Sequence, residues 1–180
     1  LRRIAGRIDG PFGAARQLLL DTPAREARQY ELRAWPRYRL GAALDPARRE
    51  LGLALPAAAA PRTRALAAQW RLEAVEPAAI VDRALAHFRA APYRYTLRPP
   101  PLSGDPVDAF LFDTRAGFCE YYAGAFVVLM RAAGVPARVV TGYLGGQASD
   151  VADYFLVRQS DAHAWAEVWL QGQGWVRIDP

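Results

Sequence analysis

The pattern of apolar and polar positions is most regular in the second half of the chain. Residues 118–133 are apolar nearly all round, which predicts a helix that lies in the middle of the fold. Gly134 and Pro136 then end this helix, as a left-handed residue followed by a helix breaker does. Strands are predicted after the helix at 137–143, 164–170 and 175–178. One buried helix followed by an antiparallel meander predicts an α+β fold.

The first half of the chain carries weaker patterns. A helix is predicted to begin near Pro77, because proline suits the first helical position. The apolar face of this helix consists of Ile80, Val81, Ala84, Leu85 and Phe88. We interpret His87, which flanks that face, as a packing or surface residue. Shorter elements are also predicted: a helix that Thr63 caps and that runs through Trp70, strands at 29–35 and 93–97, and an exposed loop at 99–106.

Cys119, the only cysteine, lies where a loop enters the long predicted helix. A thiol is a weak nucleophile until it loses its proton. Unpaired N–H groups at a helix N-terminus and a neighbouring imidazolium can together bring a thiol pKa from about 8.5 to well below 7. His163 is the candidate imidazolium, and Asp179 is the candidate acid that holds the other ring nitrogen. These three residues are the candidate catalytic group.

The residues around Cys119 suit acyl transfer. Gly117 is expected to allow an unusual backbone angle and close entry of substrate. The backbone N–H of Cys119 is a natural oxyanion donor, whereas no second donor is identifiable from the sequence. Each candidate also has a structural interpretation: a buried cysteine, a hydrogen-bonded core histidine, and an acid in a strand-end turn. The nearby tryptophans are interpreted as walls of the core or cleft: Trp165, Trp169 and Trp175.

Composition and ligand spacing narrow the expected partners. Cys119, His163 and Asp179 make a weak metal-ligand set, because no spacing such as C-x-x-C or H-x-x-x-H occurs. We therefore expect no metal and no cofactor. The formal net charge is +5, but the arginines are scattered and no nucleic-acid motif is present, so nucleic acid is not an expected partner. All 23 basic residues are arginine, so the chain offers no lysine side chain as an acyl acceptor.

The ends of the chain carry little information on targeting. No run approaches the roughly 20 apolar residues of a membrane span, and no signal peptide opens the chain. A single cysteine excludes an internal disulfide. The chain begins with Leu1 and contains a single methionine, Met130, so we expect it to be a fragment of a longer protein.

Four segments carry a recognisable set of motifs: GFCEYYA at 117–123, RAAGVPARVVTGY at 131–143, DAHAWAEV at 161–168 and GWVRIDP at 174–180. Together they resemble the transglutaminase-like superfamily. Order and spacing agree with that family, with 44 residues from Cys119 to His163 and 16 from His163 to Asp179. The likeness is closest to the TgpA type, bacterial inner-membrane proteins that carry such a domain on the periplasmic side. It is specific over 108–180 and looser over 53–97.

The resemblance implies a papain-like fold, in which a central helix carrying the nucleophile packs on an antiparallel β-sheet. It assigns Cys119 as the nucleophile, His163 as the general base and Asp179 as the orienting acid. It implies a transglutaminase-like catalytic core at 61–180, while residues 1–60, most of which show no such likeness, are expected to form an N-terminal segment of uncertain packing. The C-terminal end of that core is expected to be truncated, because the family's domain continues past the aspartate. By the same likeness, we expect a periplasmic domain whose parent protein is anchored in the bacterial inner membrane.

The functional prediction is a cysteine-dependent acyltransferase that acts on protein glutamine carboxamides through a thioester intermediate. An amine acceptor would give an isopeptide crosslink, and water would give deamidation. The expected partners are therefore a protein or peptide substrate and an amine or water as acyl acceptor. Two alternatives stay open: a cysteine peptidase or amidase that uses the same triad, and a non-catalytic module that binds a protein or a cell-wall ligand.

Overall fold

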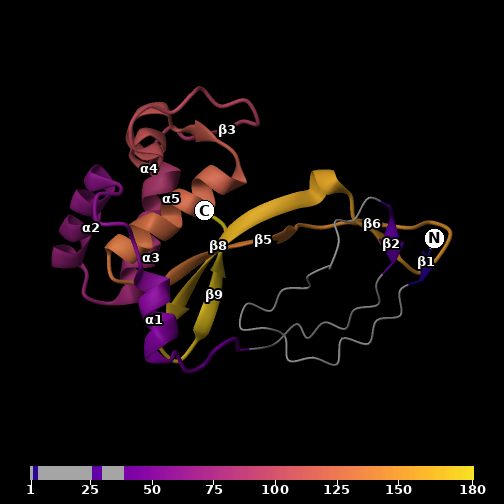
Figure 1. The fold of residues 1–180 in the computed structure, drawn as a ribbon, viewed down its shortest axis with the longest axis horizontal. Helices are drawn as coiled ribbons and strands as arrows, with labels where there is room; N and C mark the ends of the chain where they lie inside the picture. The colour runs from indigo at the N-terminus through magenta and orange to yellow at the C-terminus, as the bar shows by residue number, and fades with distance from the viewer. Residues whose placement is uncertain (1, 4–25, 30–38) are drawn as a thin grey trace. The chain divides into compact units, whose positions relative to one another are not determined.

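A helix packed on a three-stranded antiparallel sheet forms the centre of the protein in a computed structural model, which describes residues 2–3, 26–29 and 39–180 (Figure 1). The helix is α5 (Cys119–Ala132), and Gly134 follows it with a left-handed φ of 80°. The sheet has the order β5–β8–β9, with bounds Ala137–Tyr143, Ala162–Leu170 and Gly174–Ile178. The predicted α+β fold, with a central helix that carries the cysteine and packs on an antiparallel sheet, is confirmed.

The chain divides into two compact units, Leu1–Tyr38 and Arg39–Pro180. In the first unit, β1 (Arg2–Arg3) pairs in parallel with β2 (Arg28–Gln29). Apart from Gln29, the strand predicted at 29–35 lies outside the described residues. The second unit contains α5 and the three-stranded sheet. Within the described part of the chain, the structure contains no helix with the length and apolar character that a membrane crossing requires.

The side chains of β8 alternate between the two faces of the sheet. The buried face, on which α5 packs, consists of Ala164, Ala166, Val168 and Leu170. The intervening residues, from His163 to Trp169, are half-buried on the opposite face. β8 begins two residues before the predicted strand, so His163 lies inside it. The pleat of the strand therefore places His163 on the outer face of the sheet.

Helices α2 (Pro61–Glu73) and α3 (Pro77–Ala90) also pack on α5, so α5 lies between them and the sheet (Figure 1). The predicted apolar face of α3 supplies buried side chains to this layer: Ile80, Val81, Ala84 and Phe88. The remaining elements of this unit are α1 (Pro46–Leu53), β3 (Arg94–Tyr95), α4 (Pro106–Asp108), the π-helix η1 (Ala109–Thr114), β4 (Ala116–Gly117), β6 (Gln147–Ala148), β7 (Phe155–Leu156) and the 3₁₀-helix η2 (Gln159–Asp161).

The start of α2 differs from the prediction, because Thr63 does not cap it. The helix begins at Pro61, after Ala60, whose φ of 52° is left-handed. The buried Asp108 supplies the cap from a different element, since it accepts from the backbone N–H of Arg62 at 2.8 Å and of Thr63 at 2.9 Å. The Thr63 hydroxyl also donates to Asp108, at 2.6 Å. Asp108 therefore ties α2 to the segment that precedes α5.

Gly117 has a role different from the one predicted. Its φ lies outside the left-handed region, so the backbone angle does not require glycine. A Cβ at Gly117 would instead lie 2.6 Å from Cγ of Tyr121, in the first turn of α5. β4 pairs in parallel with β3, and Gly117 lies opposite Tyr95 in that pairing. The missing side chain thus lets the two short strands approach the start of the helix at Cys119.

Replacing Asp108 by alanine should lower the free energy of unfolding by about 2–4 kcal/mol, because buried N–H and hydroxyl donors lose their partner. Asp113→Ala is the matched control. The Asp113 carboxylate pairs with the Arg62 side chain at the surface, at 2.8 Å, so its loss should cost less than about 1 kcal/mol. Denaturant unfolding measures both variants, and equal losses would contradict the capping role of Asp108.

Gly117→Ala should destabilise the protein by about 1–3 kcal/mol, because the new methyl group must displace Tyr121. Gly124→Ala, within α5, serves as the comparison. A Cβ at Gly124 meets no atom within 4 Å, so alanine there should stabilise the helix by about 0.5–1 kcal/mol. Thermal unfolding should shift in opposite directions for the two variants. A Gly117→Ala protein as stable as the wild type would refute the steric argument.

Candidate active site

Cys119 is the first residue of α5, and it is half-buried. The residue before it, Phe118, has an extended backbone, and its side chain does not cap the helix. The Phe118 carbonyl accepts from the N–H of Tyr121 at 2.8 Å and of Tyr122 at 3.3 Å. The first N–H groups of a helix have no partner within the helix and favour negative charge near them. Cys119 therefore lies beside the unpaired N–H groups at the start of α5.

Adjacent strands bring His163 and Asp179 together. Ala166 of β8 lies opposite Ile178 of β9, and the same register places Asp179 diagonally across from His163 on one face. Nε2 of His163 is 2.9 Å from each carboxylate oxygen of Asp179. The two side chains are 17% and 41% exposed, respectively. Because Nε2 is engaged by the carboxylate, Nδ1 is the ring nitrogen that remains for proton exchange.

Tyr95 is the side chain that interacts with both parts of the candidate group. Within the described residues, no hydrogen bond joins the Cys119 thiol directly to His163. Burial raises the pKa of Tyr95. The Cys119 backbone N–H lowers this pKa, while the Cys119 thiol and the Asp179 carboxylate raise it. The Tyr95 ring stacks on Tyr122, with centroids 6.2 Å apart. The phenol therefore stays protonated at neutral pH.

Two neighbours of the candidate residues were missed in the sequence. Tyr95 reaches Cys119 through a pairing of two-residue strands, which no periodic pattern reveals. Arg177 lies on β9 and donates from Nη2 to Oδ2 of Asp179 at 3.1 Å. A usable signal existed for Arg177, because residues two apart on a strand share a face. Only the acid of that pair was assigned a role from the sequence.

The contacts of His87 are those of a packing residue, as predicted. Its ring makes edge contacts with Trp70 and Phe88, and its Nε2 lies 3.3 Å from the Tyr93 hydroxyl. Burial lowers the pKa of His87, and the Arg115 guanidinium lowers it further. His87 is therefore neutral at pH 7 and forms part of an aromatic layer behind α5.

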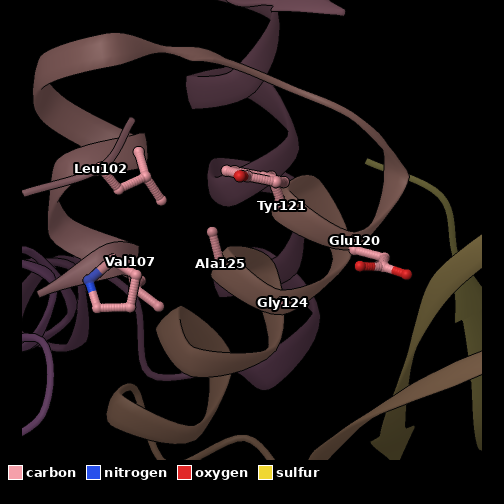
Figure 2. A pocket seen from close by; sticks show the side chains of 7 residues that line it. Leu102, Val107, Glu120, Tyr121, Gly124 and Ala125 are labelled. Atoms are coloured by element: carbon pink, nitrogen blue, oxygen red, sulfur yellow. The ribbon is translucent and has the colours of Figure 1, made fainter. Parts of the chain in front are cut away.

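A mostly apolar pocket of about 300 Å³ opens beside the first turns of α5 (Figure 2). Its lining residues are Leu102, Pro106, Val107, Glu120, Tyr121, Gly124 and Ala125. Figure 2 shows Leu102, Tyr121 and Ala125 pointing toward one another, whereas Glu120 points away from them. None of the three candidate residues lines this pocket. In the parts of the chain that the structure describes, no group of three or more His, Cys, Asp or Glu side chains could hold a metal ion.

Most of this chain is similar to known proteins. A sequence model of the transglutaminase-like superfamily matches residues 64–180. A protein-glutamine gamma-glutamyltransferase from Pseudomonas aeruginosa is 46% identical over 158 residues, which are 88% of this chain and 24% of that protein. The crystal structure of the periplasmic domain of TgpA from Pseudomonas aeruginosa matches with a TM-score of 0.79 and 48% identity, over 82% of this chain and 51% of that one.

A candidate cysteine protease from Cytophaga hutchinsonii matches with a TM-score of 0.50 and 20% identity, over 76% of this chain and 42% of that one, and shares the fold. The chain spans only about a quarter of the length of its gamma-glutamyltransferase relative. The match to the family model includes the helix of Cys119, the strand of His163, and Asp179 directly after β9. The resemblance in the four motifs is confirmed, and the chain belongs to the transglutaminase-like superfamily.

Proposed function

We propose that the chain is a cysteine-dependent acyltransferase in which Cys119, His163 and Asp179 form a catalytic triad. The observation that carries the proposal is the His163–Asp179 pair, with both carboxylate oxygens 2.9 Å from Nε2. The strand of His163 packs against the helix that begins at Cys119. A histidine held by a carboxylate can carry positive charge beside a thiolate. The 46% identity to a protein-glutamine gamma-glutamyltransferase supports this class of reaction.

In the first half of the proposed cycle, the Cys119 thiol gives its proton to Nδ1 of His163. The thiolate attacks the carboxamide carbon of a glutamine side chain, and the Cys119 backbone N–H donates to the oxyanion. His163 then protonates the nitrogen, the C–N bond breaks and ammonia leaves. A thioester between the glutamyl group and Cys119 remains. Asp179 stabilises the imidazolium during both proton transfers.

In the second half, His163 takes a proton from the acceptor while the acceptor attacks the thioester carbon. The C–S bond breaks, and the proton returns from His163 to the sulfur of Cys119. An amine acceptor yields an isopeptide bond, and water yields a glutamate side chain. The chain contains no lysine, so a lysine acceptor must lie outside these 180 residues. Each proton transfer is thereby assigned to an atom of this chain.

We further propose that residues 61–180 form the catalytic core of a periplasmic domain, carried by a bacterial inner-membrane protein. The 48% identity to the periplasmic domain of TgpA supports this location. Alkaline phosphatase fused next to the chain within its parent protein should be active, because this reporter matures only outside the cytoplasm. A cytoplasmic reporter at the same junction should be inactive. The opposite pattern of activities would refute the location.

Cys119→Ala should abolish transfer of a labelled primary amine to a glutamine-containing protein, and His163→Ala should reduce it by about 10³-fold or more. Cys119 is the only cysteine, so iodoacetamide reports on this residue alone. His163→Ala should also slow alkylation at pH 6 by about tenfold, because the imidazolium partner of the thiolate is lost. His87→Ala is the matched histidine control and should leave the alkylation rate unchanged.

The same assays discriminate among the alternatives. Retained amine transfer in Cys119→Ala would refute the proposed mechanism. Peptide fragments released with water as the sole acceptor would show a peptidase on the same triad. A thiol whose alkylation is unaffected by His163→Ala, in a protein that binds its ligand without converting it, would show a non-catalytic binding module.

A further inference from the structure

On the outer face of the sheet, four side chains, one of which is His163, form a closed ring of contacts. Oδ2 of Asp179 lies 2.9 Å from Nε2 of His163 and accepts from Nη2 of Arg177 at 3.1 Å. The guanidinium carbon of Arg177 lies 4.1 Å from the centre of the Trp165 ring. The Trp165 ring in turn stacks with the imidazole of His163, with centroids 6.3 Å apart and planes inclined by 26°. Each of the four side chains thus contacts the next.

Strand geometry explains why the ring closes. His163 and Trp165 are two residues apart on β8, and Arg177 and Asp179 are two apart at the end of β9, so all four share one face. The neighbouring strand leaves room for the indole. Gly142 of β5 lies opposite His163, and a Cβ at Gly142 would approach Cη2 of Trp165 to 2.8 Å. The Trp165 indole therefore packs between Gly142 of β5 and Arg177 of β9 on this face.

Arg177 can orient the Asp179 carboxylate, whereas it contributes little to the stability of the fold. The side chains of Arg177 and Asp179 are 42% and 41% exposed, and an ion pair of that exposure contributes little to folding. Asp179 follows Ile178, the last residue of β9, and its Oδ2 accepts from Nη2 of Arg177. Arg177 lies within the strand, and stacking on Trp165 restrains its guanidinium. The guanidinium that contacts the Asp179 carboxylate is therefore itself restrained by the Trp165 ring.

We propose that Arg177, stacked on Trp165, is a positioning residue that keeps both carboxylate oxygens of Asp179 facing Nε2 of His163. The proposal rests on the triad function above. Without Arg177, the carboxylate of Asp179 can turn toward solvent, and the imidazole loses the partner that fixes its orientation. Arg177 does not touch the reacting atoms, so its effect must pass through Asp179.

The same face of the sheet offers a matched control. Arg138 lies over the Trp175 ring, 4.3 Å from its centre, and its Nη2 is 2.6 Å from Oε2 of Glu167. Like the ring of four side chains that includes His163, this cluster contains an arginine, a tryptophan and a carboxylate, but it contains no histidine. Arg138→Met therefore removes contacts of the same kind from the fold without touching the proposed triad.

The test is a double-mutant cycle on amine transfer. Arg177→Met should lower kcat about tenfold with KM unchanged, since a small misplacement of a catalytic group slows the reaction strongly. In an Asp179→Asn background, Arg177→Met should cause no further loss, because the carboxylate that it orients is gone. Arg177→Lys, which keeps the charge, should recover part of kcat. Arg138→Met should lower the unfolding midpoint and leave kcat unchanged.

Each remaining outcome contradicts one specific claim. Normal kcat in Arg177→Met, together with low kcat in Asp179→Asn, would refute the positioning role and leave the triad intact. An equal loss from Arg177→Met in both backgrounds would show that Arg177 acts independently of Asp179, which also refutes the proposal. Normal kcat in Asp179→Asn alone would instead refute the proposed triad. Circular dichroism and unfolding midpoints for every variant separate these outcomes from loss of fold.

Discussion

The geometry of the site depends on the packing of α5 against the buried face of β8. Ala164 and Ala166 are 3% and 0% exposed on that face, and their small side chains leave room for the helix. Cys119 and His163 are separated by 44 residues of chain, so tertiary packing of this kind, and not the local chain, fixes the start of the helix relative to the strand. Burial of apolar surface, a non-directional interaction, therefore sets the positions of the Cys119 thiol and the His163 imidazole.

The two faces of the sheet have separate roles. The face toward α5 is apolar and buried, and it joins the core that α2 and α3 complete. The opposite face presents His163, Asp179 and Arg177 in half-exposed positions. Charges that keep part of their hydration avoid most of the desolvation penalty of a buried ion pair. The histidine and its carboxylate partner thus lie side by side outside the apolar core.

Periodic patterns predicted the long helix and strands well. Most of the wrong predictions concern residues whose contacts lie far away in the sequence. The strand predicted at 137–143 has the observed bounds, and the helix predicted at 118–133 differs by one residue at each end. Thr63 was assigned as a cap, although the true cap is Asp108, 45 residues away. In the site, residue chemistry and order identified His163 and Asp179, which the fold brings into contact. The pairing of His163 with the Cys119 thiol stays a prediction.

The central claim, a thioester on Cys119, is tested most directly by intact-protein mass spectrometry after rapid acid quench of the chain mixed with a glutamine-containing peptide. We expect an adduct equal to the peptide minus ammonia, located on Cys119, released by hydroxylamine and absent from Cys119→Ala and His163→Ala. A peptide that is turned over with no such adduct at any quench time, or an adduct that persists in Cys119→Ala, would refute the thioester.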